Sequence, residues 1–225
     1  MNKQAAPARR KRQVLIVDDH PLLRDGLAKV INQQADLAVC GEAADARAGL
    51  AAAAKLRPDV VIADLTMDEG NGLDLIKDLH LRQPGLPVLV LSMHHENLYA
   101  ERAVRAGARG YVMKREPIAA VLAALRKVLA GQMALSDEIV RRLLDAPPRA
   151  RKTAASPADV LSDRELEVFR LLGQGCGTRQ IAGKLRLATS TVESYRAGIK
   201  QKLGLARAPE LVARAAQFVA NEPQA

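Results

Sequence analysis

Short apolar runs alternate with longer amphipathic stretches along the first 133 residues of the chain. The runs are rich in Val, Ile and Leu and cover residues 14–17, 37–42, 60–63, 88–91 and 110–113. Such runs predict β-strands, and the continuous apolar run Val60–Ala63 predicts a strand that is buried on both faces. The stretches between them have helical spacing and cover residues 21–34, 45–56, 72–82, 96–106 and 117–130. Strand and helix therefore alternate five times.

Five strand–helix units in series predict an α/β fold, in which helices cover both faces of a parallel sheet. Pro21 and Pro117 suit the first turn of a helix, and Gly107 and Gly131 suit the position just past a helix end. We expect a doubly wound, flavodoxin-like (βα)5 sheet with strand order 2-1-3-4-5. Ligands of such sheets bind outside the carboxyl ends of the strands.

The pattern from residue 160 to residue 219 is helical throughout, which predicts a second, smaller all-α domain. Ser162 and Glu165 have the spacing of a capping box that opens its first helix. Later helices are expected over about residues 178–185, 189–203 and 208–220. Two short helices joined by a tight turn, the second bearing Ser, Thr, Arg and Lys, predict a helix-turn-helix DNA-binding unit.

These patterns set the predicted domain boundaries. Residues 1–12 form a basic tail, residues 13–133 the α/β domain and residues 160–225 the helical domain. Between the domains, residues 134–159 begin with a helix capped by Ser136 and continue as a tether rich in Pro, Ala and basic residues.

The net charge of +9 is unevenly distributed. Residues 1–12 carry +5, residues 13–135 carry −1 and residues 136–225 carry +5, so we expect the rear domain to bind a polyanion. Cys40 and Cys176 lack ligand-like spacing and predict reduced thiols in a cytoplasmic protein. No run of about 18 apolar residues occurs, so we expect no membrane partner.

Charged and hydroxyl side chains stand at the predicted strand ends. They are Asp18 and Asp19 after the first strand, Asp64 after the third, Ser92 after the fourth and Lys114 after the fifth. Three carboxylates at one edge of a sheet repel one another unless a cation is present. Because Mg²⁺ prefers oxygen ligands, we predict an acidic Mg²⁺ pocket in which Asp64 accepts a phosphoryl group.

Four segments resemble the signatures of two-component receiver domains. They are Val14-Leu-Ile-Val-Asp-Asp-His-Pro, Asp64-Leu-Thr-Met, Leu91-Ser92 and Gly110-Tyr-Val-Met-Lys114. The resemblance implies that Asp64 is the phosphoacceptor and that Asp18, Asp19 and the backbone carbonyl of Thr66 complete the Mg²⁺ site. It also implies a switch hydroxyl on Ser92, a phosphate partner in Lys114 and a switch aromatic ring in Tyr111.

One departure from the receiver pattern lies beside the pocket. Receiver domains usually follow Asp-Leu-x-Met with Pro-Gly, whereas this chain has Asp68-Glu69. The spacing to Gly72 is kept, so we expect the loop to follow the same path. The two added carboxylates raise the question of their effect on Mg²⁺ affinity and on the lifetime of the phosphorylated state.

The helical domain resembles the LuxR-type DNA-binding domain. The matching positions include Leu161-Ser-x-Arg-Glu-x-Glu-Val, Ile181-Ala182, Thr191-Val192-Glu193-Ser-Tyr-Arg196, Ile199 and Lys202-Leu203-Gly204. A receiver domain joined to this domain is the architecture of NarL/FixJ-type response regulators. Helical spacing places Val192, Ile199 and Leu203 on the core side of the third helix.

The outward side of that third helix is predicted to meet DNA. Glu193 and Ser194 are candidates for reading bases, because carboxylate and hydroxyl groups hydrogen-bond to base edges. Backbone or positioning contacts are expected from Arg179, Lys184, Thr189, Ser190, Thr191, Arg196, Ala197 and Lys200. Gly177 and Ala188 replace the usual Ser or Thr helix caps, so Thr178 and Thr189 are expected to take over one residue later.

The resemblance implies a transcription regulator that a sensor histidine kinase phosphorylates on Asp64. Phosphorylation would favour a homodimer that binds promoter DNA and acts on RNA polymerase. The last helix, with Leu211, Val212, Ala215 and Phe218, is either a dimer surface or part of a small core. We expect no enzymatic activity beyond self-phosphorylation and slow self-dephosphorylation.

Two alternatives remain open at this point. A phosphatase with an aspartyl-phosphate intermediate would also use an Asp nucleophile and Mg²⁺. Such enzymes carry a second acid two residues after the first, where this chain has Thr66. A constitutive regulator would instead bind DNA independently of phosphorylation and use the receiver only for dimerisation.

Overall fold

The computed structural model describes residues 10–67, 71–94, 96–145, 157–185 and 187–221. The chain divides into two compact units between Ala146 and Pro147, inside the stretch predicted to link the domains. Across the described residues, no helix combines the length and apolar character needed to span a lipid bilayer.

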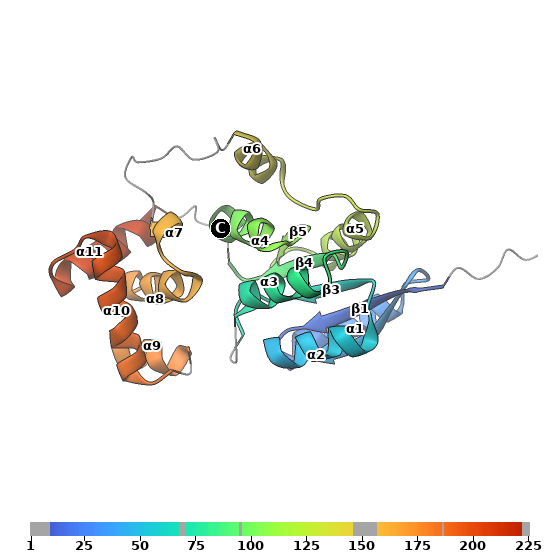
Figure 1. Cartoon of the computed structure of the whole chain (residues 1–225), viewed down its shortest axis with the longest axis horizontal. Coiled ribbons are helices and arrows are strands. Elements are labelled where there is room, and N and C mark those ends of the chain that lie inside the picture. The colour runs from blue at the N-terminus through green and yellow to red at the C-terminus, as the bar shows by residue number, and fades with distance from the viewer. Residues whose placement is uncertain (1–9, 68–70, 95, 146–156, 186, 222–225) are drawn as a thin grey trace, which may run out of the picture. The chain divides into compact units, whose positions relative to one another are not determined.

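The N-terminal unit is built on a parallel sheet. Its strands are β1 (Arg12–Val17), β2 (Leu37–Ala43), β3 (Val60–Ala63), β4 (Val88–Ser92) and β5 (Gly110–Met113). Their order is β2-β1-β3-β4-β5, which confirms the predicted order (Figure 1). All residues of β3 and β4 are buried, because both strands lie inside the sheet with helices over both faces.

Five helices cover this sheet. They are α1 (Pro21–Asn32), α2 (Ala46–Leu56), α3 (Gly72–Arg82), α4 (Glu96–Ala106) and α5 (Ile118–Leu129). Residues of α1 and α5 share one apolar cluster with Val14 and Ile16 of β1. Val17 faces the other way, so close to α2 that a Cβ on Gly49 would lie 2.8 Å from its Cγ1. Because α3 packs against both α2 and α4, these three helices cover the second face.

The sheet extends slightly beyond the predicted boundaries. Arg12 lies opposite Leu37 in the sheet and forms a 3.0 Å ion pair with Asp59, so the last residue of the predicted tail belongs to β1. Residues 1–9 lie outside the described part of the chain. At the other edge, the Ala134 backbone N–H donates to the Arg109 carbonyl at 2.9 Å, which continues the pairing past β5.

The first part of the linking segment packs on the N-terminal unit. α6 (Asp137–Asp145) begins after Ser136, whose hydroxyl accepts a hydrogen bond from the Ile139 N–H at 3.4 Å. Ile139 is buried, and α6 packs against α4. Arg142 donates to the Asn97 carbonyl at 3.4 Å. The predicted tether lies largely in residues 146–156, outside the described residues.

The C-terminal unit is helical, as predicted. It contains α7 (Pro157–Val160), α8 (Asp163–Gly173), α9 (Thr178–Lys184), α10 (Thr189–Leu203) and α11 (Ala208–Ala220). The predicted capping box is present, since the Glu165 N–H donates to the Ser162 hydroxyl and the Ser162 N–H donates to the Glu165 carboxylate. Phe169, Val192 and Ile199 are fully buried, whereas Leu203 is partly buried.

The last helix packs into this core. Leu211 and Ala215 are buried, and the Phe218 ring lies 5.6 Å from the Phe169 ring. α8 and α11 approach so closely that a Cβ on Gly173 would lie 2.4 Å from the Ala215 carbonyl oxygen. The apolar stripe of α11 therefore serves the core, and Val212 is the large apolar residue of this helix that is exposed.

The prediction that Thr178 and Thr189 replace Gly177 and Ala188 as helix caps is wrong. α9 begins at Thr178 with Gly177 as its N-cap residue, and α10 begins at Thr189 with Ala188 in that position. Neither cap residue offers a side-chain hydrogen bond. At the start of α9 the Gln180 side chain accepts a hydrogen bond from the Gly177 N–H at 2.8 Å, so the helix start is held without a hydroxyl cap.

Candidate functional site

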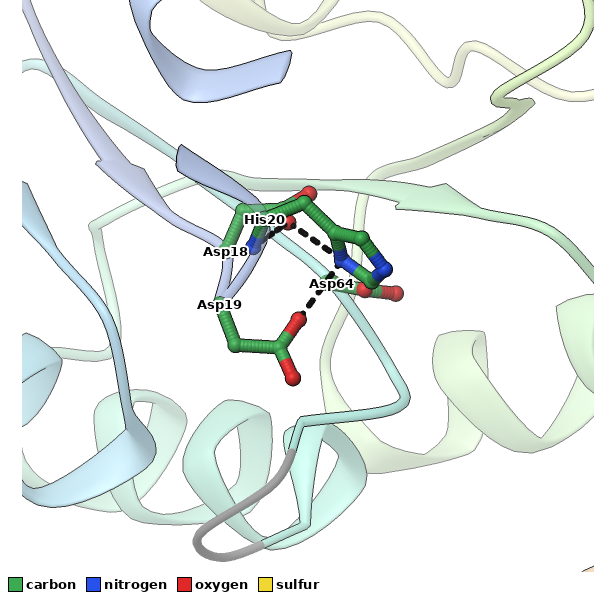
Figure 2. A group of neighbouring side chains, drawn as sticks. All are labelled: Asp18, Asp19, His20 and Asp64. Carbon is green, nitrogen blue, oxygen red and sulfur yellow. Dashed lines mark hydrogen bonds and ion pairs between the residues drawn. The ribbon is translucent and has the colours of Figure 1, made fainter. Parts of the chain in front are cut away.

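The polar strand ends converge at the carboxyl edge of the sheet, as the sequence predicted. Asp18 follows β1, Asp64 follows β3 and Lys114 follows β5. The Asp64 N–H donates to the Val17 carbonyl at 2.9 Å, which continues the β1–β3 pairing to the level of the pocket. Figure 2 shows Asp18, Asp19, His20 and Asp64 grouped at this edge.

Lys114 joins two of the three carboxylates. Its Nζ lies 2.6 Å from Asp64 Oδ2 and 2.8 Å from Asp18 Oδ2. All three side chains are at most 5% exposed, so the ion pairs are shielded from solvent. Breaking such a pair would leave an uncompensated buried charge.

The pocket carries excess negative charge, because among the described residues a single ammonium faces three carboxylates. Burial raises the pKa of Asp64 to about 6; Asp18 adds to this rise, whereas Lys114 opposes it. Burial lowers the pKa of Lys114, but Asp64 and Asp18 outweigh that effect and hold this pKa above its ordinary value. A cation beside the carboxylates would relieve the repulsion.

The donor set fits a divalent cation. Asp18, Asp19, His20 and Asp64 each offer one ligand atom, and these atoms all lie within 4.8 Å of one another. Hard cations prefer carboxylate oxygens of this kind. The Thr66 N–H donates to Asp64 Oδ1 at 3.2 Å, so Thr66 borders the pocket. Its backbone carbonyl as a ligand stays a prediction.

The ends of the loop between β3 and α3 are fixed by backbone contacts. The Gly72 N–H donates to the Leu65 carbonyl at 3.0 Å, and Thr66 pairs with Asn71 in an isolated bridge. A Cβ on Gly72 would lie 2.0 Å from the Asp64 carbonyl oxygen, so only glycine allows this approach. Asp68 and Glu69 lie outside the described residues.

The predicted switch residues lie in a buried hydrogen-bond network beside the pocket. The Ser92 hydroxyl accepts a hydrogen bond from the His94 N–H at 3.2 Å, and the Tyr111 hydroxyl donates to the His94 carbonyl at 2.8 Å. Ser92 and Tyr111 are both buried. Burial raises the pKa of Tyr111 above its ordinary value, and a hydrogen bond with Ser92 partly offsets this rise. Tyr111 therefore lies inward, next to the switch hydroxyl.

Two histidines at this site were not among the predicted residues. His94 Nε2 lies 2.7 Å from the Thr66 hydroxyl, and its ring stacks on Tyr99 at 4.6 Å. His20 Nδ1 lies 2.7 Å from Asp19 Oδ1. The sequence held a signal for each. His20 directly follows the acidic pair Asp18-Asp19. His94 lies two residues after Ser92, just as Thr66 lies two residues after Asp64 at the end of the neighbouring strand.

The predicted DNA-contacting residues lie on the outward side of the C-terminal unit. Those classed as exposed are Arg179, Lys184, Thr189, Ser190, Glu193, Ser194 and Ala197, and those partly exposed are Thr191, Arg196 and Lys200. Of the three residues predicted to face the core from α10, Val192 and Ile199 are buried and Leu203 is partly buried. Which of the outward residues contact DNA stays a prediction.

A polar cluster links the start of α9 to α10. The Thr178 hydroxyl donates to Glu193 Oε1 at 2.7 Å, and Arg196 forms a 3.0 Å ion pair with the same oxygen. Arg196 also donates to the Thr178 hydroxyl. Thr178, expected to cap α9, is instead used to position two candidate DNA-contacting side chains.

Comparison with known families matches both units. The family described as the response regulator receiver domain matches residues 14–126. The family described as bacterial regulatory proteins of the luxR family matches residues 159–215.

Individual relatives match along most of the chain. The oxygen regulatory protein NreC of Staphylococcus aureus (strain bovine RF122 / ET3-1) is 33% identical over 205 residues, covering 89% of this chain and 94% of the relative. A structure of RcsB from Salmonella enterica serovar Typhimurium, bound to promoter rprA in the presence of the phosphomimetic BeF3−, has a TM-score of 0.59. It is 29% identical and covers 92% of this chain and 99% of that chain.

A LuxR-family two-component response regulator from Aurantimonas sp. SI85-9A1 is 31% identical, with a TM-score of 0.56, and covers 60% of this chain and 97% of that chain. The chain therefore belongs to the response regulators that join a receiver domain to a LuxR-type helix-turn-helix domain, and it is a DNA-binding transcription regulator controlled by phosphorylation.

Proposed function

We propose that Asp64 is the phosphoacceptor and that a sensor histidine kinase supplies the phosphoryl group. The observation that carries this assignment is the position of Lys114, whose Nζ lies 2.6 Å from Asp64 and 2.8 Å from Asp18 in a buried pocket. An ammonium fixed there is placed to pair with an oxygen of an incoming phosphoryl group.

In the proposed transfer, a carboxylate oxygen of Asp64 attacks the phosphorus of a phosphohistidine. A new P–O bond forms while the P–N bond breaks, and the kinase histidine leaves with the electron pair of the broken bond. Lys114 and the Ser92 hydroxyl are the candidates to bind the phosphoryl oxygens. Mg²⁺, held by Asp18, Asp19 and Asp64 with the Thr66 carbonyl, would supply charge neutralisation.

Phosphorylation adds about −1.5 to −2 charges to this pocket. We expect the Ser92 hydroxyl to turn towards the phosphoryl group and to leave its contact with the His94 N–H. Tyr111, which is hydrogen-bonded to the His94 carbonyl, would then repack. These movements would favour a homodimer that binds promoter DNA at two half-sites about one helical turn apart.

The proposed chemistry is self-modification rather than turnover of a free phosphoester. Thr66, which stands two residues after Asp64, offers a hydroxyl that contacts His94 rather than a second carboxylate. Slow loss of the phosphoryl group to water would reset the protein. A regulator of promoters acts in the cytoplasm, with RNA polymerase as the partner it must reach.

Incubation with a small phosphodonor and Mg²⁺, followed by intact-mass measurement, tests the phosphoacceptor. The protein should gain the mass of one phosphoryl group. Asp64→Asn should gain none, whereas Asp78→Asn, which removes an exposed carboxylate on α3, should behave as wild type. Phosphorylation of Asp64→Asn to the wild-type level would rule out the assignment.

Two substitutions on α10 test the DNA-binding surface. Lys200→Ala should weaken binding to all sequences alike and reduce the salt slope by about one, because it removes a phosphate contact. Glu193→Ala should relax the preference at one base pair. If both variants bound DNA as the wild type does, α10 would not be the recognition helix.

A further inference from the structure

His20 belongs to the cation pocket by position as well as by sequence. It is the N-cap residue of α1, and its backbone N–H donates to Asp18 Oδ1 at 2.8 Å. This tight turn brings the ring back over the acidic pair (Figure 2). Nδ1 lies 3.1 Å from Asp18 Oδ1 and 2.7 Å from Asp19 Oδ1.

These spacings suit ligands of one metal ion. Two ligands about 2.1 Å from a metal and at right angles to each other lie roughly 3.0 Å apart. The two distances from His20 Nδ1 bracket that value. The Asp64 carboxylate completes the group, since all four ligand atoms lie within 4.8 Å of one another.

His20 and Lys114 contact different oxygens of the Asp18 carboxylate. Lys114 contacts Oδ2 of Asp18, whereas His20 contacts Oδ1. The lysine therefore leaves Oδ1 available to a cation on the His20 side. The His20 side chain is 63% exposed, so the ring stands at the mouth of the pocket, where it can adjust to a metal.

A nitrogen ligand changes which cations a site prefers. Carboxylates, carbonyls and water suit Mg²⁺, whereas imidazole suits metals such as Zn²⁺ and Ni²⁺. Affinity for a given N/O site also rises from Mn²⁺ through Co²⁺ to Ni²⁺. A pocket with oxygen ligands alone would gain less from this trend than one that includes an imidazole.

We propose that His20 is a direct ligand of the metal ion in this pocket. It gives the pocket a preference for divalent transition-metal ions such as Co²⁺ over Mg²⁺. The inference rests on the proposed function, because it concerns the same cation site. It adds a ligand and a metal class to the carboxylate site implied for receiver domains.

Calorimetric titration of the full-length protein with Co²⁺ and with Mg²⁺, at one fixed pH, tests the proposal. His20→Ala removes a direct ligand and should therefore lose at least the roughly tenfold in Co²⁺ affinity that loss of an outer-shell partner costs. The Mg²⁺ affinity should change less than about twofold, because Mg²⁺ retains its carboxylate ligands. His80→Ala, which removes an exposed histidine on α3, is the matched control and should leave both affinities unchanged. Proton NMR of the Co²⁺-loaded wild type should show a paramagnetically shifted imidazole resonance that His20→Ala lacks.

The outcomes separate this inference from the proposed function. If Mg²⁺ binds and Asp64 is phosphorylated but the ratio of Co²⁺ to Mg²⁺ affinity is the same in wild type and His20→Ala, the proposed role of His20 is wrong and the phosphoacceptor assignment stands. An equal loss of both metals in His20→Ala would indicate a structural role and also overturn the inference. If neither metal binds the wild type, both proposals fail.

Discussion

At the residue scale, the charge of the pocket depends on the ratio of cationic side chains to carboxylates. Lys114 is shared by Asp18 and Asp64, and all three side chains are buried. Burial raises the pKa of Asp64 to about 6 even with Lys114 beside it. The ammonium therefore stabilises the charged form of the acceptor, and a divalent cation would stabilise it further.

Replacement of Lys114 tests how strongly the buried carboxylates depend on its ammonium group. Lys114→Met leaves two buried carboxylates without their shared partner, so we expect the free energy of unfolding to fall by roughly 3–5 kcal/mol. Added Mg²⁺ should restore part of the loss, because it neutralises the same carboxylates. Urea unfolding with and without Mg²⁺ measures both effects.

Lys77→Met is the control for the Lys114 replacement. Its ion pair with Asp74 is more than half exposed, and its loss should change stability by less than about 0.5 kcal/mol. Equal effects of the two substitutions would contradict the view that the buried pair is structurally important.

At the scale of elements, the start of α3 is placed by one glycine. A Cβ on Gly72 would meet the Asp64 carbonyl oxygen at 2.0 Å and the Leu65 Cα at 2.5 Å. Both are backbone atoms, so the neighbours cannot move aside without shifting the strand end that carries the acceptor. The close approach therefore requires a glycine at position 72, where α3 begins.

Gly72→Ala should destabilise the N-terminal unit by roughly 1–3 kcal/mol and slow phosphorylation, because Asp64 must shift. Gly26→Ala is the matched change, since Gly26 lies within α1 and a Cβ added there would have no atom within 4 Å beyond its own turn of helix. It should stabilise the helix by about 0.5–1 kcal/mol. Thermal unfolding measures both, and two substitutions of the same sign would contradict this explanation.

In the C-terminal unit, Glu165 ties the start of α8 to α10. Its carboxylate accepts hydrogen bonds from the Ser162 N–H at 2.7 Å and from Lys202 Nζ at 2.6 Å. Burial by itself raises the pKa of Glu165, but Lys202 and Ser162 outweigh burial and hold this pKa below its ordinary value of 4.5. The charged form is therefore favoured by folding.

The pH dependence of stability follows from that depressed pKa. The contribution of Glu165 is fully present above its ordinary pKa of 4.5 and is lost as the pH falls through the lower folded-state value. Glu165→Gln should make the unfolding free energy fall less steeply as the pH drops below about 4.5. Lys202→Ala should also make this fall less steep. Denaturant titrations over this pH range check both, and an unchanged slope in both variants would contradict the assignment.

At the scale of the whole molecule, the chain has two units with separate cores. Phosphate uptake is proposed for one and DNA binding for the other, so a response to phosphorylation has to reach the second unit from the first. α6 begins that segment and is already packed on α4 of the N-terminal unit. A change in the receiver therefore has a packed element through which to reach the linking segment.

Separation of the units should remove the response to phosphorylation. A fragment of residues 147–225 should bind DNA equally well with and without a phosphodonor, because it has its own core but no acceptor. The full chain should change its DNA affinity by roughly 5- to 150-fold. Binding titrations with labelled DNA compare the two, and an equal response of the fragment would exclude control by Asp64.

The sequence was most informative where one local pattern decides the outcome. The apolar runs predicted all five strands, and the alternation of strand and helix in five successive units predicted their order. The strand-end positions of Asp18, Asp64 and Lys114 then predicted their convergence. The capping box at Ser162 was also predicted, since its two hydrogen bonds depend on residues three apart.

The tertiary structure decided what depends on contacts between distant segments or on the fold of a tight turn. His94 meets the Thr66 hydroxyl because β3 and β4 are neighbours. α6 packs on α4, and its residue Ile139 is buried. Thr178 contacts Glu193 and Arg196 instead of capping a helix. His20 turns back over the acids through a hydrogen bond of its own backbone. The sequence determined which side chains reach the carboxyl edge of the sheet, whereas packing decided which of them touch. The reason is that a contact depends on the position of a second segment, which local spacing does not specify.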